Sequence, residues 1–328
     1  MPRVFYTPAY DVAFLGLERL HPFDSRKSTR ALRLARSALG ASLDELVMTP
    51  EAPATERSLR LIHQDAYLSS LRNSAVVSRV LEMAVLRWLP GAMIDRAVLR
   101  PMRWAVQGTI DAARYALTHG AAINLAGGYH HAHRDHGEGF CAYADIPIAI
   151  EAMRRDGLLS ERDRVLIIDL DAHRGNGFES IHTCDERVVY FDLYNAQVYP
   201  GPARVPASHM LLVPCLAGMN DQQYFHALQK HLPAVLKTGP FALAFYNAGT
   251  DVLSGDPLGG LNLTREAVLR RDRYVIETLE TACIPWVMVP SGGYTEESHK
   301  LLADTLVWAC GRQSTPGTPN TMDSNKFA

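Results

Sequence analysis

The sequence has few of the features that mark a secreted or membrane-spanning chain. It contains five cysteines among 328 residues, at positions 141, 184, 215, 283 and 310, and no two of them form a CxxC pair. An odd number of scattered cysteines argues against a disulfide framework and indicates reduced thiols. The sequence contains no run of 18 apolar residues, and its first segment, Met1 to Pro8, lacks the apolar region of a signal peptide. We therefore expect a cytoplasmic protein that does not span a membrane.

An excess of charge of one sign is also absent. The formal net charge is −2, which argues against direct binding of nucleic acid through bulk positive charge. Apolar groups are scarce only in residues 312–328, which are rich in Ser, Thr, Pro, Gly and Asn and are expected to be disordered. Hydrophobic residues make up 47% of the whole chain, enough for a large core. We therefore predict one domain over residues 1–311 and a disordered tail over 312–328.

Apolar runs alternate with amphipathic segments along this domain. Strands are predicted to begin near residues 4, 121, 165, 187, 210, 241 and 285. Helices are predicted over 26–39, 58–70, 100–118, 144–155, 178–183, 221–236, 264–283 and 301–309. Pro90 predicts a loop with buried aromatic content over 83–94. The alternation predicts an α/β fold.

The segment from Val165 to Gly177 carries the first candidate site. Its apolar start predicts a strand buried on both faces, and Asp169, Asp171 and His173 follow at alternate positions. Because alternate residues of an extended chain share a face, Asp171 and His173 could reach one cation. Taken alone, the pattern fits a strand end with solvated acids equally well.

Three other apolar runs end in polar residues and glycine. One ends at the pair His130 and His131, one at Asp251, and one at Tyr294 after two glycines. Ligands of parallel sheets bind beyond the carboxyl ends of the strands. The four strand ends together therefore predict one shared site.

The motifs at these ends resemble those of the zinc-dependent histone deacetylase superfamily. The matching segments are Gly127–Ala132, Gly139–Cys141, Asp169–His173, Asn247–Asp251 and Ser291–Tyr294. The class IV branch is the most similar, through Gly139–Ile146, Ile167–His173, Tyr246–Asp251, Leu258–Leu261, Gly16–Glu18 and Leu20–Asp24. The resemblance covers residues 4–310. It implies an arginase-like single domain around a central, mostly parallel eight-stranded sheet flanked by helices, and an enzyme that removes acyl groups from the Nε atom of lysine in a protein or peptide.

The resemblance also implies roles for individual residues. Asp171, His173 and Asp251 correspond to the ligands of one catalytic ion, Zn²⁺ or alternatively Fe²⁺, that polarises the amide carbonyl and activates water. His131 corresponds to the general base and acid, and His130 to its electrostatic partner. The donor to the oxyanion corresponds to Tyr294. Asp169 corresponds to the carboxylate that orients His130, and Asn176 stands where many members have an aspartate facing the other histidine.

A tunnel and a structural potassium site are implied as well. Gly139 and Phe140 correspond to one wall of the acyl-lysine tunnel, and Tyr199 to the opposite wall. The potassium ligands correspond to Asp169, Asp171, His173, Asp192 and Leu193. Class IV similarity implies a preference for long fatty acyl groups, and we expect a channel lined by Phe14, Leu15, Leu17, Trp88 and Met93.

Other functions remain open at the level of the sequence. An acetylpolyamine amidohydrolase shares these motifs but usually has an inserted loop that narrows its entrance, and no clear insertion is visible here. An arginase-like enzyme with two manganese ions needs further carboxylates, whereas Gly175, Asn247 and Gly249 occupy the corresponding positions. A non-catalytic acyl-lysine binding module is expected where a ligand or the tyrosine is lost, and this chain keeps them all. The sequence leaves the oligomeric state open.

Overall fold

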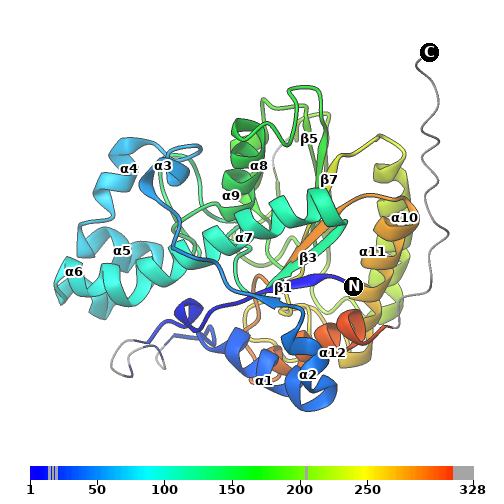
Figure 1. The fold of residues 1–328 in the computed structure, drawn as a ribbon, viewed down its shortest axis with the longest axis horizontal. Coiled ribbons are helices and arrows are strands. Elements are labelled where there is room, and N and C mark those ends of the chain that lie inside the picture. The colour runs from blue at the N-terminus through cyan, green and yellow to red at the C-terminus, as the bar shows by residue number, and fades with distance from the viewer. Residues whose placement is uncertain (14–15, 17, 19–20, 204–205, 313–328) are drawn as a thin grey trace.

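The strands predicted from apolar runs pair side by side in one sheet. The computed structural model describes residues 1–13, 16, 18, 21–203 and 206–312 (Figure 1). Its strands are β1 (Arg3–Phe5), β2 (Val47–Met48), β3 (Ala121–Asn124), β4 (Val165–Asp169), β5 (Val188–Asn195), β6 (Met210–Cys215), β7 (Leu243–Asn247) and β8 (Trp286–Val289). They form a sheet of eight strands in the order β2-β1-β3-β8-β7-β4-β5-β6. All pairings are parallel, so the predicted eight-stranded α/β architecture is confirmed and the sheet is parallel throughout.

Helices cover both faces of the sheet because alternate strand residues point to opposite sides. In β4, Leu166 and Ile168 belong to one core, and Val165 and Ile167 belong to the other. The first core is closed by α1 (Lys27–Leu39), α2 (Ala41–Asp44), α10 (Asp221–Leu236), α11 (Arg265–Thr281) and α12 (Ser298–Gly311). The second is closed by α7 (Arg100–His119), α8 (Asp145–Arg155) and α9 (Asn176–His182) (Figure 1). Every residue of β4 is buried, which explains why Val165 to Ile168 are all apolar.

A group of short helices lies at one end of α7 (Figure 1). They are α3 (Glu56–Leu59), α4 (Asp65–Ser70), α5 (Ser74–Val80), a 3₁₀ helix (Ala84–Trp88), α6 (Gly91–Ile94) and a π-helical turn (Asp95–Leu99) that continues into α7. The single helix predicted over 58–70 is wrong, because the chain turns between α3 and α4, where His63 is buried and accepts a hydrogen bond from the backbone N–H of Ala144 (3.0 Å).

The loop predicted over 83–94 is also wrong. Two helical segments flank Pro90, which precedes the first residue of α6, a position where its missing N–H is not needed. The buried aromatic content expected there is contradicted as well, because Trp88 is 79% exposed.

The strand order brings the predicted site together. β3, β8, β7 and β4 are consecutive in the sheet, although they are far apart in the sequence. Their carboxyl ends therefore present four polar segments at one edge of the sheet. Within the part of the chain that the structure describes, no helix has the length and apolarity needed to cross a bilayer. Residues 313–328, most of the predicted tail, lie outside the described residues.

Candidate metal centre and active site

Three buried side chains converge beyond the ends of β4 and β7. The ligand atoms of Asp171, His173 and Asp251 lie within 4.8 Å of one another. The Nδ1 atom of His173 is 2.9 Å from Asp251 Oδ2 and 3.1 Å from Asp171 Oδ1. Backbone N–H groups hold the remaining carboxylate oxygens: Gly292 donates to Asp171 Oδ2 (2.8 Å) and Ala172 donates to Asp251 Oδ1 (2.9 Å). Two carboxylates and one imidazole are a donor set that suits a divalent ion with open coordination positions.

The charges in this cluster also favour a cation. Burial and the neighbouring carboxylate of Asp171 raise the pKa of Asp251 to about 7. Two carboxylates that share a buried site cannot both ionise easily unless positive charge compensates them. The residues present therefore fit a divalent metal ion, in both their chemistry and their charge.

The histidine pair lies in the loop after β3, and each ring has its own oxygen partner. The two ring centroids are 4.1 Å apart. His130 Nδ1 is 2.9 Å from Asp169 Oδ2, and His131 Nδ1 is 2.7 Å from the amide oxygen of Asn176. Because an amide oxygen accepts, His131 carries its proton on Nδ1 and leaves Nε2 unprotonated when the ring is neutral.

The two histidines have opposite pKa shifts. Burial lowers the pKa of His130, but the carboxylates of Asp169 and Asp171 more than offset this and raise it to about 9. Burial, together with the positive charges of His130 and His173, lowers the pKa of His131 well below its usual value. A cationic and a neutral imidazole side by side can serve as an electrostatic partner and a base.

Tyr294 lies over the cluster on a glycine-rich segment. A Cβ atom at Gly292 would come within 2.5 Å of Asp251 Oδ2 and 2.6 Å of Asp171 Oδ2, so only glycine lets this backbone approach so closely. The ring centroids of Tyr294 and His173 are 5.9 Å apart. Burial, followed by the charges of Asp171 and Asp251, raises the pKa of Tyr294 well above its usual value. Its hydroxyl group therefore stays protonated and can donate a hydrogen bond.

Two buried carboxylates that the sequence analysis missed hold these loops. Asp145, at the start of α8, accepts hydrogen bonds from the N–H groups of Gly128 and Tyr129, next to the histidine pair. Asp256 accepts one from the N–H of Tyr294 (2.8 Å). Asp145 lies inside the matched segment Gly139–Ile146, which was the available signal, but its burial depends on the packing of α8 against α7.

A buried lysine was missed as well. Lys27, in the first turn of α1, is 2% exposed. Its Nζ atom donates to the carbonyl oxygens of Pro290 (3.3 Å), Ser291 (2.7 Å) and Gly292 (2.9 Å). The amphipathic pattern that predicts this helix gives no sign that a lysine at its first position faces inward.

The predicted tunnel residues lie beside the catalytic candidates. Tyr199 is 44% exposed, and its ring centroid is 5.1 Å from that of His131. The Phe140 ring centroid is 6.0 Å from that of Tyr294. Gly139 is tightly enclosed, because a Cβ there would lie 2.5 Å from the His131 ring. Together, these positions place Tyr199 and Phe140 at the site.

An apolar cavity of about 120 Å³ adjoins Phe140 and Ser291. Part of the predicted channel lining is wrong: Trp88 and Met93 are 79% and 40% exposed and do not line this cavity. Phe14, Leu15 and Leu17 lie outside the described residues. The apolar lining comes instead from Leu81, Met83, Leu86, Val98, Met102 and Leu125.

Two of the predicted potassium ligands, Asp169 and Asp192, lie opposite each other on β4 and β5. The hydroxyl of Tyr190 lies 2.9 Å from Asp169 Oδ2 and 3.0 Å from Asp192 Oδ2. Asp192 Oδ1 is buried without a hydrogen-bond partner among the described residues. Burial and the nearby Asp169 raise the pKa of Asp192 well above its usual value. An unpartnered buried carboxylate oxygen fits a cation at this position, next to Leu193 on β5.

Comparisons with known proteins relate the chain to one family. Residues 21–310 match the family model for the histone deacetylase domain. Histone deacetylase 2 of Arabidopsis thaliana is 38% identical over 303 residues, which cover 92% of this chain and 77% of that protein. An uncharacterized protein of Picosynechococcus is 33% identical over 264 residues, covering 80% of this chain and 83% of its own length.

A solved structure supports the fold independently. The crystal structure of the HDA15 HD domain matches with a TM-score of 0.73, covering 95% of this chain and 91% of that chain at 20% identity. The family model and the Arabidopsis relative each span most of the chain, and the motifs lie at the edge of the sheet where their resemblance predicts them. The chain therefore belongs to the histone deacetylase family.

Proposed function

We propose that this protein is a metal-dependent hydrolase that removes acyl groups from the Nε atom of lysine in proteins or peptides. One observation carries the proposal: Asp171, His173 and Asp251 have their ligand atoms within 4.8 Å of one another. The histidine pair and Tyr294 surround this cluster. Membership of the histone deacetylase family supports the assignment of a hydrolase, and of a deacetylase in particular.

In this proposal, Asp171, His173 and Asp251 hold Zn²⁺ or Fe²⁺. When bound, such an ion supplies Lewis acidity to a substrate carbonyl and to water. Asp169, Asp192 and Leu193, with the backbone carbonyls of Asp171 and His173, hold a structural K⁺. The unpartnered Oδ1 atom of Asp192 supports this second assignment.

The protein groups carry the proton transfers. Asn176 fixes the Nδ1–H of His131, so the neutral ring accepts a proton at Nε2 from the water that attacks the carbonyl carbon. The same proton then goes to the lysine nitrogen as its bond to the carbonyl carbon breaks. His130, held by Asp169, keeps a positive charge beside the reacting groups. Tyr294 donates its hydroxyl hydrogen to the oxyanion that develops on the carbonyl oxygen.

The acyl-lysine chain is proposed to enter between Tyr199 and the Gly139–Phe140 segment. The apolar cavity beyond Phe140 supports acceptance of acyl chains longer than acetyl. Each CH₂ buried there contributes about 0.8 kcal/mol, or about fourfold in kcat/KM. We therefore propose that longer acyl groups are preferred to acetyl.

A panel of substrates tests the proposal. The wild-type protein is assayed for kcat/KM with acetyl-, octanoyl- and myristoyl-lysine in one peptide sequence, and with acetylpolyamines. Faster hydrolysis of octanoyl- or myristoyl-lysine is expected. If acetyl-lysine is the best of the three, the chain-length proposal is wrong and the deacylase proposal stands. Activity on acetylpolyamines alone identifies the amidohydrolase alternative, and binding of acyl-lysine peptides without hydrolysis identifies the non-catalytic one.

A further inference from the structure

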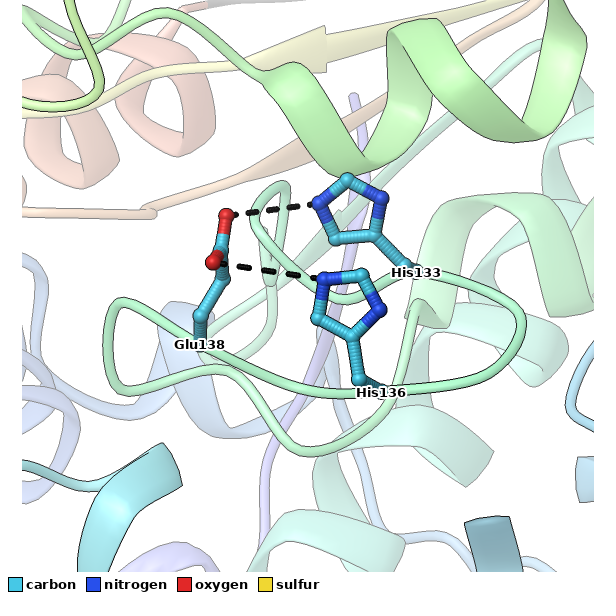
Figure 2. A group of neighbouring side chains, drawn as sticks. All are labelled: His133, His136 and Glu138. Atoms are coloured by element: carbon cyan, nitrogen blue, oxygen red, sulfur yellow. Dashed lines mark hydrogen bonds and ion pairs between the residues drawn. The ribbon is translucent and has the colours of Figure 1, made fainter. Parts of the chain in front are cut away.

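A second group of metal-competent side chains lies in the loop after the histidine pair. His133, His136 and Glu138 have ligand atoms within 4.8 Å of one another. His133 Nε2 is 3.3 Å from Glu138 Oε1, and His136 Nε2 is 4.0 Å from Glu138 Oε2. Figure 2 shows the carboxylate facing the same edge of both rings. No part of the proposed hydrolysis uses His136.

The outer nitrogen of each ring is already engaged. His133 Nδ1 is 2.7 Å from Ser180 Oγ, whose own hydrogen goes to the carbonyl of Gly177 (2.9 Å). In this arrangement Ser180 Oγ can accept from His133 Nδ1. His136 Nδ1 is 2.7 Å from the carboxylate of Asp135, which can only accept. With the proton on Nδ1, each ring directs an unprotonated Nε2 at Glu138, which is the tautomer that binds a metal ion. Without an ion, His133 Nε2 can instead donate to Glu138 Oε1 (3.3 Å). Metal-binding histidines have the same arrangement, with the other N–H donated to an oxygen.

The spacing and exposure suit a small ion. The rings stack with centroids 4.1 Å apart and planes 11° from parallel. Ligands about 2.0–2.2 Å from a tetrahedral ion lie roughly 3.3–3.6 Å from one another, close to the separations seen here. The His136 side chain is 50% exposed, whereas the His133 side chain is 14% exposed and lies on the protein side of the group. Water can supply a fourth ligand from the open side.

We propose that His133, His136 and Glu138 bind a divalent transition-metal ion such as Zn²⁺, and that this ion slows the reaction at the neighbouring site. The binding part of the proposal is independent of the activity. The inhibitory part rests on the proposed function.

Asn176 connects the two sites. Its side-chain N–H₂ donates to Glu138 Oε1 and lies 3.3 Å from His133 Nε2, while its oxygen accepts from His131 (2.7 Å). An ion that takes the His133 nitrogen and a Glu138 oxygen competes for both acceptors of this amide. The amide is then free to rotate and no longer fixes the His131 ring. A general base typically contributes about 10²–10⁴-fold, so loss of the group that orients His131 is expected to remove part of this, a decrease of about tenfold in kcat.

The test counts ions and measures activity in the same samples. Wild type, His136→Asn and the matched control His226→Asn, an exposed histidine on α10, are dialysed against zinc buffers in the micromolar range of free ion. Wild type and His226→Asn should hold two ions per chain, and His136→Asn one. Turnover should fall about tenfold in the first two as the second ion binds, and stay constant in His136→Asn.

Each result decides one part of the proposal. One ion per wild-type chain across this range, or two in His136→Asn, overturns the site. Two ions in wild type with an equal loss of turnover in His136→Asn overturns the coupling to His131. The Asp251→Ala variant should still bind one ion, at the second site, and the double variant Asp251→Ala with His136→Asn should bind none. The number of bound ions therefore tests the second metal site even if the wild type hydrolyses no acyl-lysine peptide. Such a lack of activity would refute the proposed function but not the second metal site.

Discussion

Replacing Lys27 with methionine should reduce turnover far more than stability. The ammonium group is buried and donates to three consecutive carbonyls, of Pro290, Ser291 and Gly292, that lead to Tyr294. Gly292 in turn donates its N–H to Asp171. The lysine therefore fixes a segment that touches both a candidate metal ligand and the candidate oxyanion donor.

The effect of Lys27→Met on the free energy of unfolding is the difference between two energies of similar size, the loss of hydrogen bonds and the relief of burying a charge. Methionine leaves the carbonyls of Pro290 and Ser291 without a donor among the described residues, at about 1–3 kcal/mol each. The carbonyl of Gly292 still accepts from the backbone N–H and the hydroxyl of Thr250. Methionine also removes the cost of burying an ammonium. Burial, only partly opposed by Asp251 and Asp171, lowers the pKa of Lys27 from 10.5 to about 8. This shift corresponds to about 3 kcal/mol. The sum predicts a net loss of about 1 kcal/mol in the free energy of unfolding.

Turnover is the sensitive measurement. A displacement of about 1 Å in a catalytic segment can cost 10²-fold, so Lys27→Met should lower kcat by about that factor. Lys27→Arg, which keeps the charge and the donors, should restore most of it. Urea unfolding followed by circular dichroism measures stability, and a peptide deacylation assay measures kcat. If folded Lys27→Met retains kcat within about threefold of the wild type, the positioning role is refuted.

Three further predictions address the site and the cavity. Asp251→Ala should abolish turnover and lower the metal content while circular dichroism shows the fold retained; full activity in the metal-depleted variant would contradict the ligand assignment. Tyr294→Phe should lower kcat by about 10²–10³, and a change below about threefold in steady-state assays would mean that the hydroxyl is not the oxyanion donor. Val98→Phe, which fills part of the cavity, should lower kcat/KM for myristoyl-lysine more than for acetyl-lysine; an unchanged ratio would show that the acyl chain does not enter there.

The sequence predicts the main elements well where one periodic pattern runs without interruption. The first four residues of β4 are apolar because both faces of the strand are covered, and the helix predicted over 221–236 is observed as α10 with the same bounds. Prediction fails between residues 58 and 94, where several short helices pack together beside α7. Each of these helices is too short to show a period of its own, and their ends depend on distant contacts such as the one between His63 and Ala144.

The motif residues of the candidate site could be picked out from the sequence, but the residues that hold their loops in place could not. Each motif could be placed at the carboxyl end of a strand. That β3, β8, β7 and β4 are neighbours follows from the topology, and without the resemblance the sequence could not show it. Lys27, Asp145 and Asp256 act through hydrogen bonds to backbone groups of other loops. Such bonds leave no pattern in the sequence, because the backbone atoms they bind are the same in every residue.

Asn176 places a neutral side chain beside the candidate base, His131. An amide orients the imidazole of His131 but stabilises its cationic form less than a carboxylate does. The negative charge lies one step further away, on Glu138, which accepts a hydrogen bond from the Asn176 amide. Partial burial raises the pKa of Glu138, but the hydrogen bonds from Asn176 and Tyr199 outweigh it and lower the pKa, so the carboxylate stays ionised. The charge that faces the candidate base is therefore set by a partly exposed loop residue. A carboxylate at position 176 would lie in direct contact with His131, whereas Glu138 is separated from His131 by Asn176 and remains within reach of solvent and of the ion proposed above.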